Sequence, residues 1–109
     1  MTIDQVTERV RSSAGTDHSR TNHHGISLEQ ALVPPREISI IDREVRYGKV
    51  VDQVIRVWLV GNERPADGYK IIMRGDGLQF GLASSGFAHD PYPILVGWYG
   101  SLIAAFMGM

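Results

Sequence analysis

Apolar side chains recur at helical spacing near the start of the chain, at Ile3, Val6 and Val10. Thr2 and Gln5 have the spacing of a capping box, in which two side chains satisfy free backbone N–H groups at the start of a helix. These positions predict a helix over residues 2–11. A helix this short is marginal in water by itself, so it must pack against another element or fray.

The segment that follows, residues 12–25, is polar and contains three of the four histidines. Its only apolar residue is Ala14, which is typical of a linker or mobile loop. We therefore predict that residues 1–25 are an N-terminal helix with a flexible, histidine-containing linker. Residues 26–109 are then predicted to form a single domain.

Beyond residue 26 the hydrophobic period changes from helical to alternating. Ser27 and Gln30 form a second capping box and begin one or two helical turns, which Pro34 and Pro35 should end. Alternating apolar positions then predict four strands, over Arg36–Ile41, Val50–Val60, Tyr69–Arg74 and Leu78–Ala83. The last three are joined by short turns, so the spacing predicts an antiparallel meander.

The strongest of these strands is Val50–Val60, in which six of eleven residues are valine or isoleucine. Both of its faces carry apolar groups, which predicts a central strand covered on both sides for much of its length. Arg56 interrupts one face and should be paired or lie near an edge.

The last third of the chain, residues 77–109, carries a single charge, Asp90, and six of the nine aromatic residues. Ser101 is a candidate cap for a C-terminal helix over Leu102–Met107, which could begin as early as Gly97. The predicted fold class is therefore α+β: an antiparallel meander sheet of about four strands, a short N-terminal helix, and a C-terminal helix packed on the sheet.

Composition excludes several classes of function. Eleven basic and twelve acidic residues give a formal charge of −1, unlike a strongly basic nucleic-acid binder. The absence of cysteine excludes a disulfide framework, a thiolate metal site and a cysteine nucleophile. The uncharged run Ile94–Met109 is shorter than the roughly 18–20 residues that cross a bilayer. We expect no cofactor, nucleic-acid or membrane partner, and the lack of a secretory signal favours a cytoplasmic location.

Two groups of residues could carry chemistry. Asp17, His18, His23 and His24 include metal-ligand types, but adjacent histidines in a flexible loop rarely form a rigid site, so we predict no specific metal site. Ser85, His89 and Asp90 bring a hydroxyl, an imidazole and a carboxylate close in sequence. The strict G-x-S-x-G elbow is absent because position 83 is alanine.

The remaining candidates are residues that anchor protein interfaces, where Trp and Tyr contribute most of the binding energy. The predicted partner-binding residues are Trp58, Phe87, His89, Asp90, Tyr92, Trp98 and Tyr99. The segment 87–92 is the preferred site because aromatic residues in a loop have less structural reason to be there.

These patterns favour a small protein-binding module, such as an inhibitor, an immunity-type protein or an assembly subunit, that acts by contact rather than catalysis. The alternative is a small hydrolase that uses Ser85, His89 and Asp90. Self-association through the apolar C-terminal segment is a further prediction. The sequence resembles no particular family, so these interpretations rest on residue patterns alone.

Overall fold

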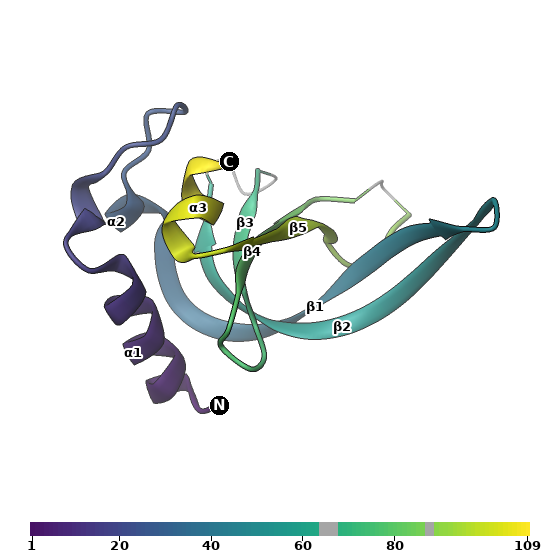
Figure 1. Ribbon diagram of the computed structural model, residues 1–109, viewed down its shortest axis with the longest axis horizontal. Helices are drawn as coiled ribbons and strands as arrows, with labels where there is room; N and C mark the ends of the chain where they lie inside the picture. Colours follow the sequence, from purple (N-terminus) through teal and green to yellow (C-terminus); the bar gives the residue numbers. More distant parts are fainter. Residues whose placement is uncertain (64–67, 87–88) are drawn as a thin grey trace.

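The computed structural model describes residues 1–63, 68–86 and 89–109. Along the chain the elements are α1 (Ile3–Ala14), the 3-10 turn η1 (Asp17–Ser19), α2 (Leu28–Ala31), β1 (Leu32–Arg46), β2 (Lys49–Asn62), β3 (Lys70–Arg74), β4 (Phe80–Ser84), β5 (Ile94–Gly100) and α3 (Leu102–Met107). The helices gather at one end of the molecule, and the β1–β2 hairpin extends to the other (Figure 1).

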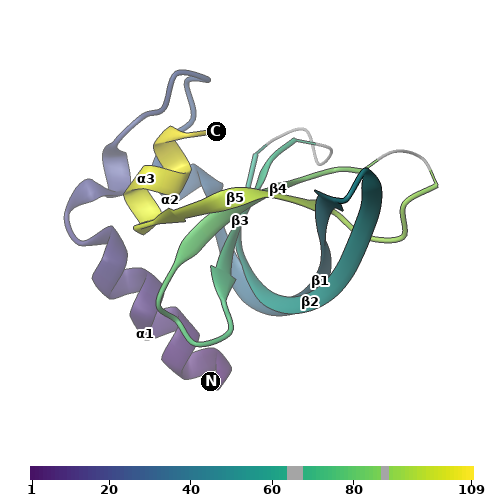
Figure 2. The same cartoon turned by 45° about the vertical axis from the view of Figure 1, so that its right-hand side comes forward.

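The strands form a closed barrel in the order β1-β2-β3-β4-β5. Consecutive strands are antiparallel, and the barrel closes where β1 and β5 pair in parallel at Ile41 and Ile94. The Ile41 N–H donates to the Pro93 carbonyl at 2.8 Å. Figure 2 shows how strongly β1 and β2 curve to reach this closure.

The predicted open sheet of about four strands is therefore wrong. The missed element is β5, for which the sequence predicts no strand and whose last residues, from Gly97, it allows to begin the C-terminal helix. Its apolar run does not alternate with polar residues, so periodicity alone could not distinguish strand from helix. Gly100, with a φ of +82°, separates the strand from α3, where the Ser101 side chain accepts a hydrogen bond from the Ala104 N–H as the sequence predicts.

The N-terminal helix is confirmed, together with both hydrogen bonds of its capping box. The Gln5 N–H donates to Thr2 Oγ1 at 3.2 Å, and the Thr2 N–H donates to Gln5 Oε1 at 2.8 Å. The helix continues to Ala14 and buries that residue and Val6 completely in the hydrophobic core. This packing stabilises a helix that would be marginal alone. The domain boundary at residue 25 stays a prediction.

Two hydrophobic cores lie on opposite faces of the sheet. The barrel core fills the lumen with side chains from all five strands: Ile38, Ile40, Ile55, Val57, Ile72, Ala83, Leu95 and Trp98. The outer core lies between the sheet and the helices, and its largest buried side chains include Phe80, Phe106 and Leu28. In β2 these two cores take alternate residues, with Val57 inside the barrel and Trp58 under the helices.

Strand β1 is longer than predicted at both ends. It starts before Pro34 and Pro35, where the pairing with β2 is irregular between Leu32 and Arg36. Proline removes a backbone donor, so such an irregular stretch is where a strand tolerates it. The predicted short helix does end ahead of the prolines, at Ala31.

Candidate functional site

The outer part of the β1–β2 hairpin, residues 42–53, projects from the barrel, and we call it the hairpin arm. Its strands pair in continuous register out to Arg46 opposite Lys49, leaving a two-residue turn of Tyr47 and Gly48. Both turn residues have positive φ, 51° and 75°, as a type I′ turn requires. The Tyr47 side chain at the tip is completely exposed, with a relative exposure of 103%.

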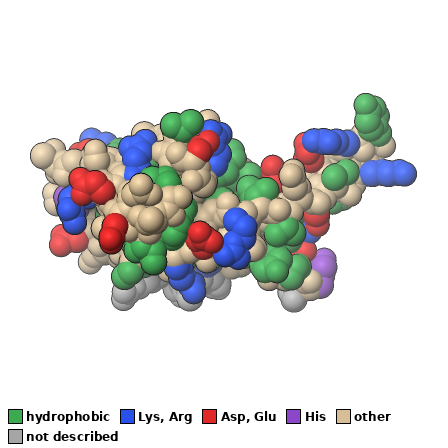
Figure 3. Space-filling model, turned by 90° about the horizontal axis from the view of Figure 1, so that it is seen from below, with side chains coloured by type: hydrophobic (Ala, Val, Ile, Leu, Met, Phe, Trp, Pro, Cys, Tyr) green, Lys and Arg blue, Asp and Glu red, His purple; other side chains and the backbone are tan. Residues whose placement is uncertain are grey.

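One face of the arm is apolar in its outer part. Val45 and Val50 are directly opposite each other and are 70% and 65% exposed, and Val54 further down the same face is 55% exposed. Cross-strand partners in a sheet share a face, so these side chains line one side of the ribbon. Figure 3 shows the arm standing out from the body, with hydrophobic side chains at its end between Lys and Arg side chains.

The opposite face of the arm is mostly charged. Arg46 and Lys49 form its outermost pair, and Glu44 lies opposite Val51. Glu44 also forms an ion pair with Arg46, whereas Lys49 forms no salt bridge with any described residue. The tip therefore combines an exposed aromatic ring with an unneutralised positive charge.

Arg43 links the arm to the segment that precedes β5. Its guanidinium donates to both carboxylate oxygens of Asp52, at 2.7 and 2.8 Å, and to Asp90 Oδ1 at 2.8 Å. The hydrogen bonds that Arg43 donates to these two carboxylates raise its pKa, and the hydrogen bond from Arg43 lowers the pKa of Asp52. The Asp90 side chain is only 3% exposed, so this contact fixes the base of the arm against a buried charge.

The predicted site residues are divided between core and surface. Trp58 is buried in the outer core, and Trp98 packs against the barrel core. Tyr92 and Tyr99 are 41% and 39% exposed. Phe87 lies outside the described residues. The structure thus places the two tryptophans on opposite faces of the sheet and does not bring them into one patch.

The residues of the hydrolase alternative lie near Arg43. The Asp90 carboxylate, the orienting acid of that interpretation, is engaged by the Arg43 guanidinium. The His89 side chain is 81% exposed, and its Nε2 is 3.8 Å from Asp90 Oδ1. Ser85 lines a cavity of about 380 Å³ together with Gly86 and Ile94. The hydrolase interpretation stays a prediction.

One imidazole of the histidine segment contacts the carboxylate of a distant residue. His24 contacts the Glu63 carboxylate, and its ring meets that of His23 edge-on at 4.3 Å between centroids. Within residues 1–63, 68–86 and 89–109, no group of three or more His, Asp or Glu side chains is arranged to hold a metal ion.

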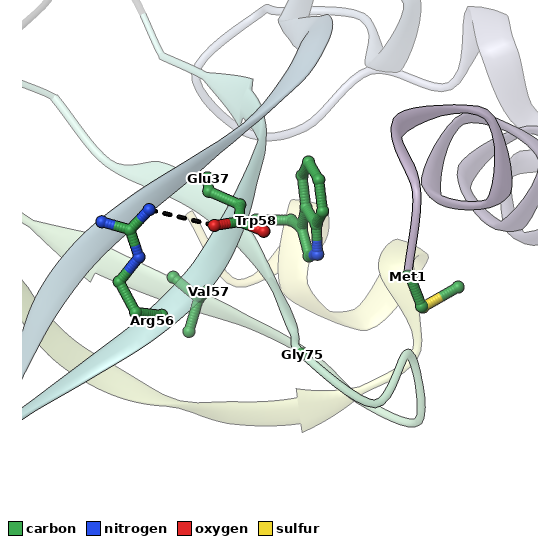
Figure 4. A pocket seen from close by; sticks show the side chains of 6 residues that line it. All are labelled: Met1, Glu37, Arg56, Val57, Trp58 and Gly75. Atoms are coloured by element: carbon green, nitrogen blue, oxygen red, sulfur yellow. Dashed lines mark hydrogen bonds and ion pairs between the residues drawn. The ribbon is translucent and has the colours of Figure 1, made fainter.

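A smaller cavity lies between Trp58 and the start of α1. Figure 4 shows the Trp58 indole between Met1 and the pair formed by Glu37 and Arg56. Its volume of about 120 Å³ is below the roughly 300–1,000 Å³ of typical ligand sites, so it is a packing gap. The ion pair confirms the prediction that Arg56 is paired.

Sequence reasoning missed the apolar face of the arm. The sequence patterns do not single out Val45, Tyr47 or Val50 as exposed. The signal that could have found them is the dipeptide Tyr47–Gly48 itself, because two-residue hairpin turns favour Asn or Asp before glycine.

Comparisons with protein-family models, with curated proteins and with solved structures found no match. None of the helices in the part of the chain that the structure describes combines the length and apolarity needed to span a membrane.

Proposed function

We propose that this protein is a protein-binding module that contacts its partner through the hairpin arm. The partner surface is an apolar groove with an acidic rim, which receives Tyr47 and the valine face. The inhibitor, immunity-type and assembly-subunit roles are the forms that such a module takes, and the expected cytoplasmic location is part of this proposal.

The observation that carries the proposal is the position of Tyr47. Non-glycine residues with positive φ are uncommon, and those that adopt it readily are Asn and Asp rather than bulky aromatics. A tyrosine here has a less favourable backbone conformation than Asn would. Because its side chain is completely exposed, no packing within the chain compensates for that cost. Departures from local sequence rules without a structural gain are expected at functional positions.

The valine face supplies the second part of the contact. Val45 and Val50 form an exposed cross-strand pair next to the tip, and both would be buried if the arm lay in a groove. An aromatic anchor surrounded by smaller apolar contacts is the usual composition of a binding hot spot. The projecting shape allows the arm to enter a concave surface.

The positive charge at the tip of the arm predicts an acidic rim on the partner's groove. Lys49 forms no salt bridge with a described residue, so a carboxylate on the partner can pair with it. Such rim charges increase the association rate and the specificity more than they increase affinity. A partner with a basic rim would be repelled.

The test is affinity capture from the native host with three forms of the chain. The Val45→Thr/Val50→Thr double variant keeps β-branched residues in the arm but adds a hydroxyl to each exposed side chain. Val96→Thr is the matched control, because Val96 is 48% exposed on β5. A stoichiometric partner retained by the wild type and the control, but lost by the double variant, supports the proposal.

Two outcomes overturn it. In one, the double variant retains the partner as well as the control does, which places the contact elsewhere. In the other, only further copies of this chain are recovered, and size measurements show an oligomer that the double variant still forms. Binding to the purified partner by titration then gives the affinity of each form.

A further inference from the structure

A cavity of about 380 Å³ lies between β1, β2, the start of β3 and the segment before β5. It is lined by the backbone or side chains of Arg36, Ile38, Ser39, Arg56, Leu59, Lys70, Tyr92 and Pro93. This volume lies within the range of small-molecule sites, roughly 300–1,000 Å³.

The topology explains why these residues meet. Strands β1, β3 and β5 run in the same direction, because β2 and β4 are antiparallel to their neighbours and β1 is parallel to β5. The starts of β1 and β3 therefore lie at one end of the barrel, and β5 begins beside Ile41, further along β1. Lys70 is the first residue of β3, Pro93 immediately precedes β5, and Arg36 lies in the first part of β1. The cavity is the mouth of the lumen at that end.

The charged residues among the described lining residues are all cationic. Three cationic residues line the mouth, Arg36, Arg56 and Lys70, and the described lining residues include no carboxylate. Arg56 is already paired with Glu37 at 3.0 Å. Arg36 is exposed and forms no ion pair or side-chain hydrogen bond with any described residue, so its five N–H donors can all serve a ligand.

The rest of the lining is apolar or aromatic. Leu59 is buried, Ile38 is half-buried against the barrel core, and the Tyr92 ring is 41% exposed beside Pro93. These groups can cover the body of a flat ligand, while the Arg36 guanidinium matches a carboxylate or phosphate in bidentate geometry.

We propose that the barrel mouth binds a small organic anion, in which a phosphate or carboxylate is carried on an aromatic ring. Arg36 holds the anionic group, and Tyr92 packs against the ring. The site is independent of the arm and does not require the proposed function to be correct.

The probe is phenyl phosphate, titrated into the full chain and followed by calorimetry and by NMR shifts of the residues at the mouth. Inorganic phosphate carries only the anionic group and phenol only the aromatic ring. Titrated separately, each should bind at least about tenfold more weakly than phenyl phosphate. Benzoate in place of phenyl phosphate distinguishes a carboxylate ligand from a phosphate ligand.

Arg36→Gln should weaken binding of phenyl phosphate by about 10-fold to 100-fold, the effect of losing one charged hydrogen-bonding partner. Arg36→Lys keeps the positive charge but loses the planar, bidentate arrangement of N–H donors, so it should give an intermediate affinity. Arg46→Gln is the matched control, because it removes the same charge from the arm, and it should change the affinity less than about twofold, as expected where no hydrogen bond to the ligand is lost.

Absence of saturable binding of both phenyl phosphate and benzoate overturns the proposal. So does an equal loss of affinity in Arg36→Gln and Arg46→Gln, since that indicates attraction by overall charge alone. Tyr92→Ala provides a second variant should Arg36→Gln alter the thermal melt. An affinity unchanged in Tyr92→Ala would remove the aromatic part of the site.

Discussion

The base and the arm of the β1–β2 hairpin are built from the same two strands, yet their valine and isoleucine side chains have opposite surroundings. At the base, Ile40 and Val57 are buried in the barrel core, whereas Val45 and Val50 in the arm are mostly exposed. The difference comes from neighbouring strands. β3 pairs with β2 only from Val57 onward, and β5 meets β1 at Ile41, so the arm has no third strand beside it.

This difference separates stability from interaction. A two-stranded ribbon without a covered face is marginal by itself, so the arm depends on its continuity with the barrel and on the Arg43 contact for its order. Apolar groups at the base contribute to folding, and those in the arm remain available to a partner. Substitutions can therefore test the two regions separately.

The largest effect on stability is expected in the outer core. Phe106→Ala should lower the free energy of unfolding by about 3–5 kcal/mol, because it removes a completely buried ring between α3 and the sheet. Urea unfolding measures the loss. The adjacent Met107 is 40% exposed, and Met107→Ala should cost much less; equal losses would show that α3 does not pack as described.

A matched pair of valines compares base with arm directly. Val57→Ala should cost about 2 kcal/mol, since two buried methyl groups are lost at about 0.8 kcal/mol each and a small cavity is left. Val50→Ala should cost less than about 0.5 kcal/mol because its side chain is 65% exposed. The comparison fails if the two midpoints of urea unfolding shift by the same amount.

The ion pair between Arg43 and Asp52 predicts how the free energy of unfolding changes with pH. The pKa of Asp52 is lowered in the folded state, so this carboxylate contributes stability above its unfolded pKa of about 3.9, and the contribution is lost as pH falls through the folded value. In Arg43→Gln that contribution is missing, because Asp52 and Asp90 both lose their contact with the guanidinium. The wild type should exceed the variant most above about pH 5, with the gap closing in acid.

Arg74 provides the control for this experiment. It pairs with Asp76 at the β3–β4 turn and lowers the pKa of that carboxyl in the same way. Arg74→Gln should flatten the acid limb of the stability curve as Arg43→Gln does, but it should leave partner binding unchanged. A parallel pH profile for wild type and Arg43→Gln would show that the ion pair between Arg43 and Asp52 does not contribute to stability.

Local features of the fold could be predicted from sequence, and the closure could not. The capping boxes at Thr2 and Ser27 and the cap at Ser101 depend on residues three positions apart, so the helix starts were found. Closure depends on a single strand pairing between Ile41 and Ile94, residues far apart in the chain. No local pattern encodes such a contact.

The candidate site could be predicted only in part for a related reason. Alternation correctly indicated a strand at Val50, but how much of that strand has a neighbour on its other edge depends on where β3 ends. Trp58 and Trp98 were predicted to be interface residues, whereas in the structure Trp58 lies in the outer core and Trp98 packs against the barrel core. The turn at Tyr47 was the one local departure that sequence could have flagged as functional.

The smallest effect on stability is expected at Tyr47, and it coincides with the largest effect on binding. Tyr47→Asn restores the residue that a type I′ turn favours, so the free energy of unfolding should stay within about 0.5 kcal/mol of wild type or rise. Leu78→Asn is the control, because Leu78 is 68% exposed in the β3–β4 turn. Urea unfolding establishes that both variants are folded.

The most direct test of the arm as the binding element is quantitative capture of the partner by folded Tyr47→Asn, set against wild type and Leu78→Asn. Our account predicts that Tyr47→Asn loses most of the captured partner while Leu78→Asn retains it. Capture by Tyr47→Asn at the wild-type level would contradict the account and place the interaction on another surface.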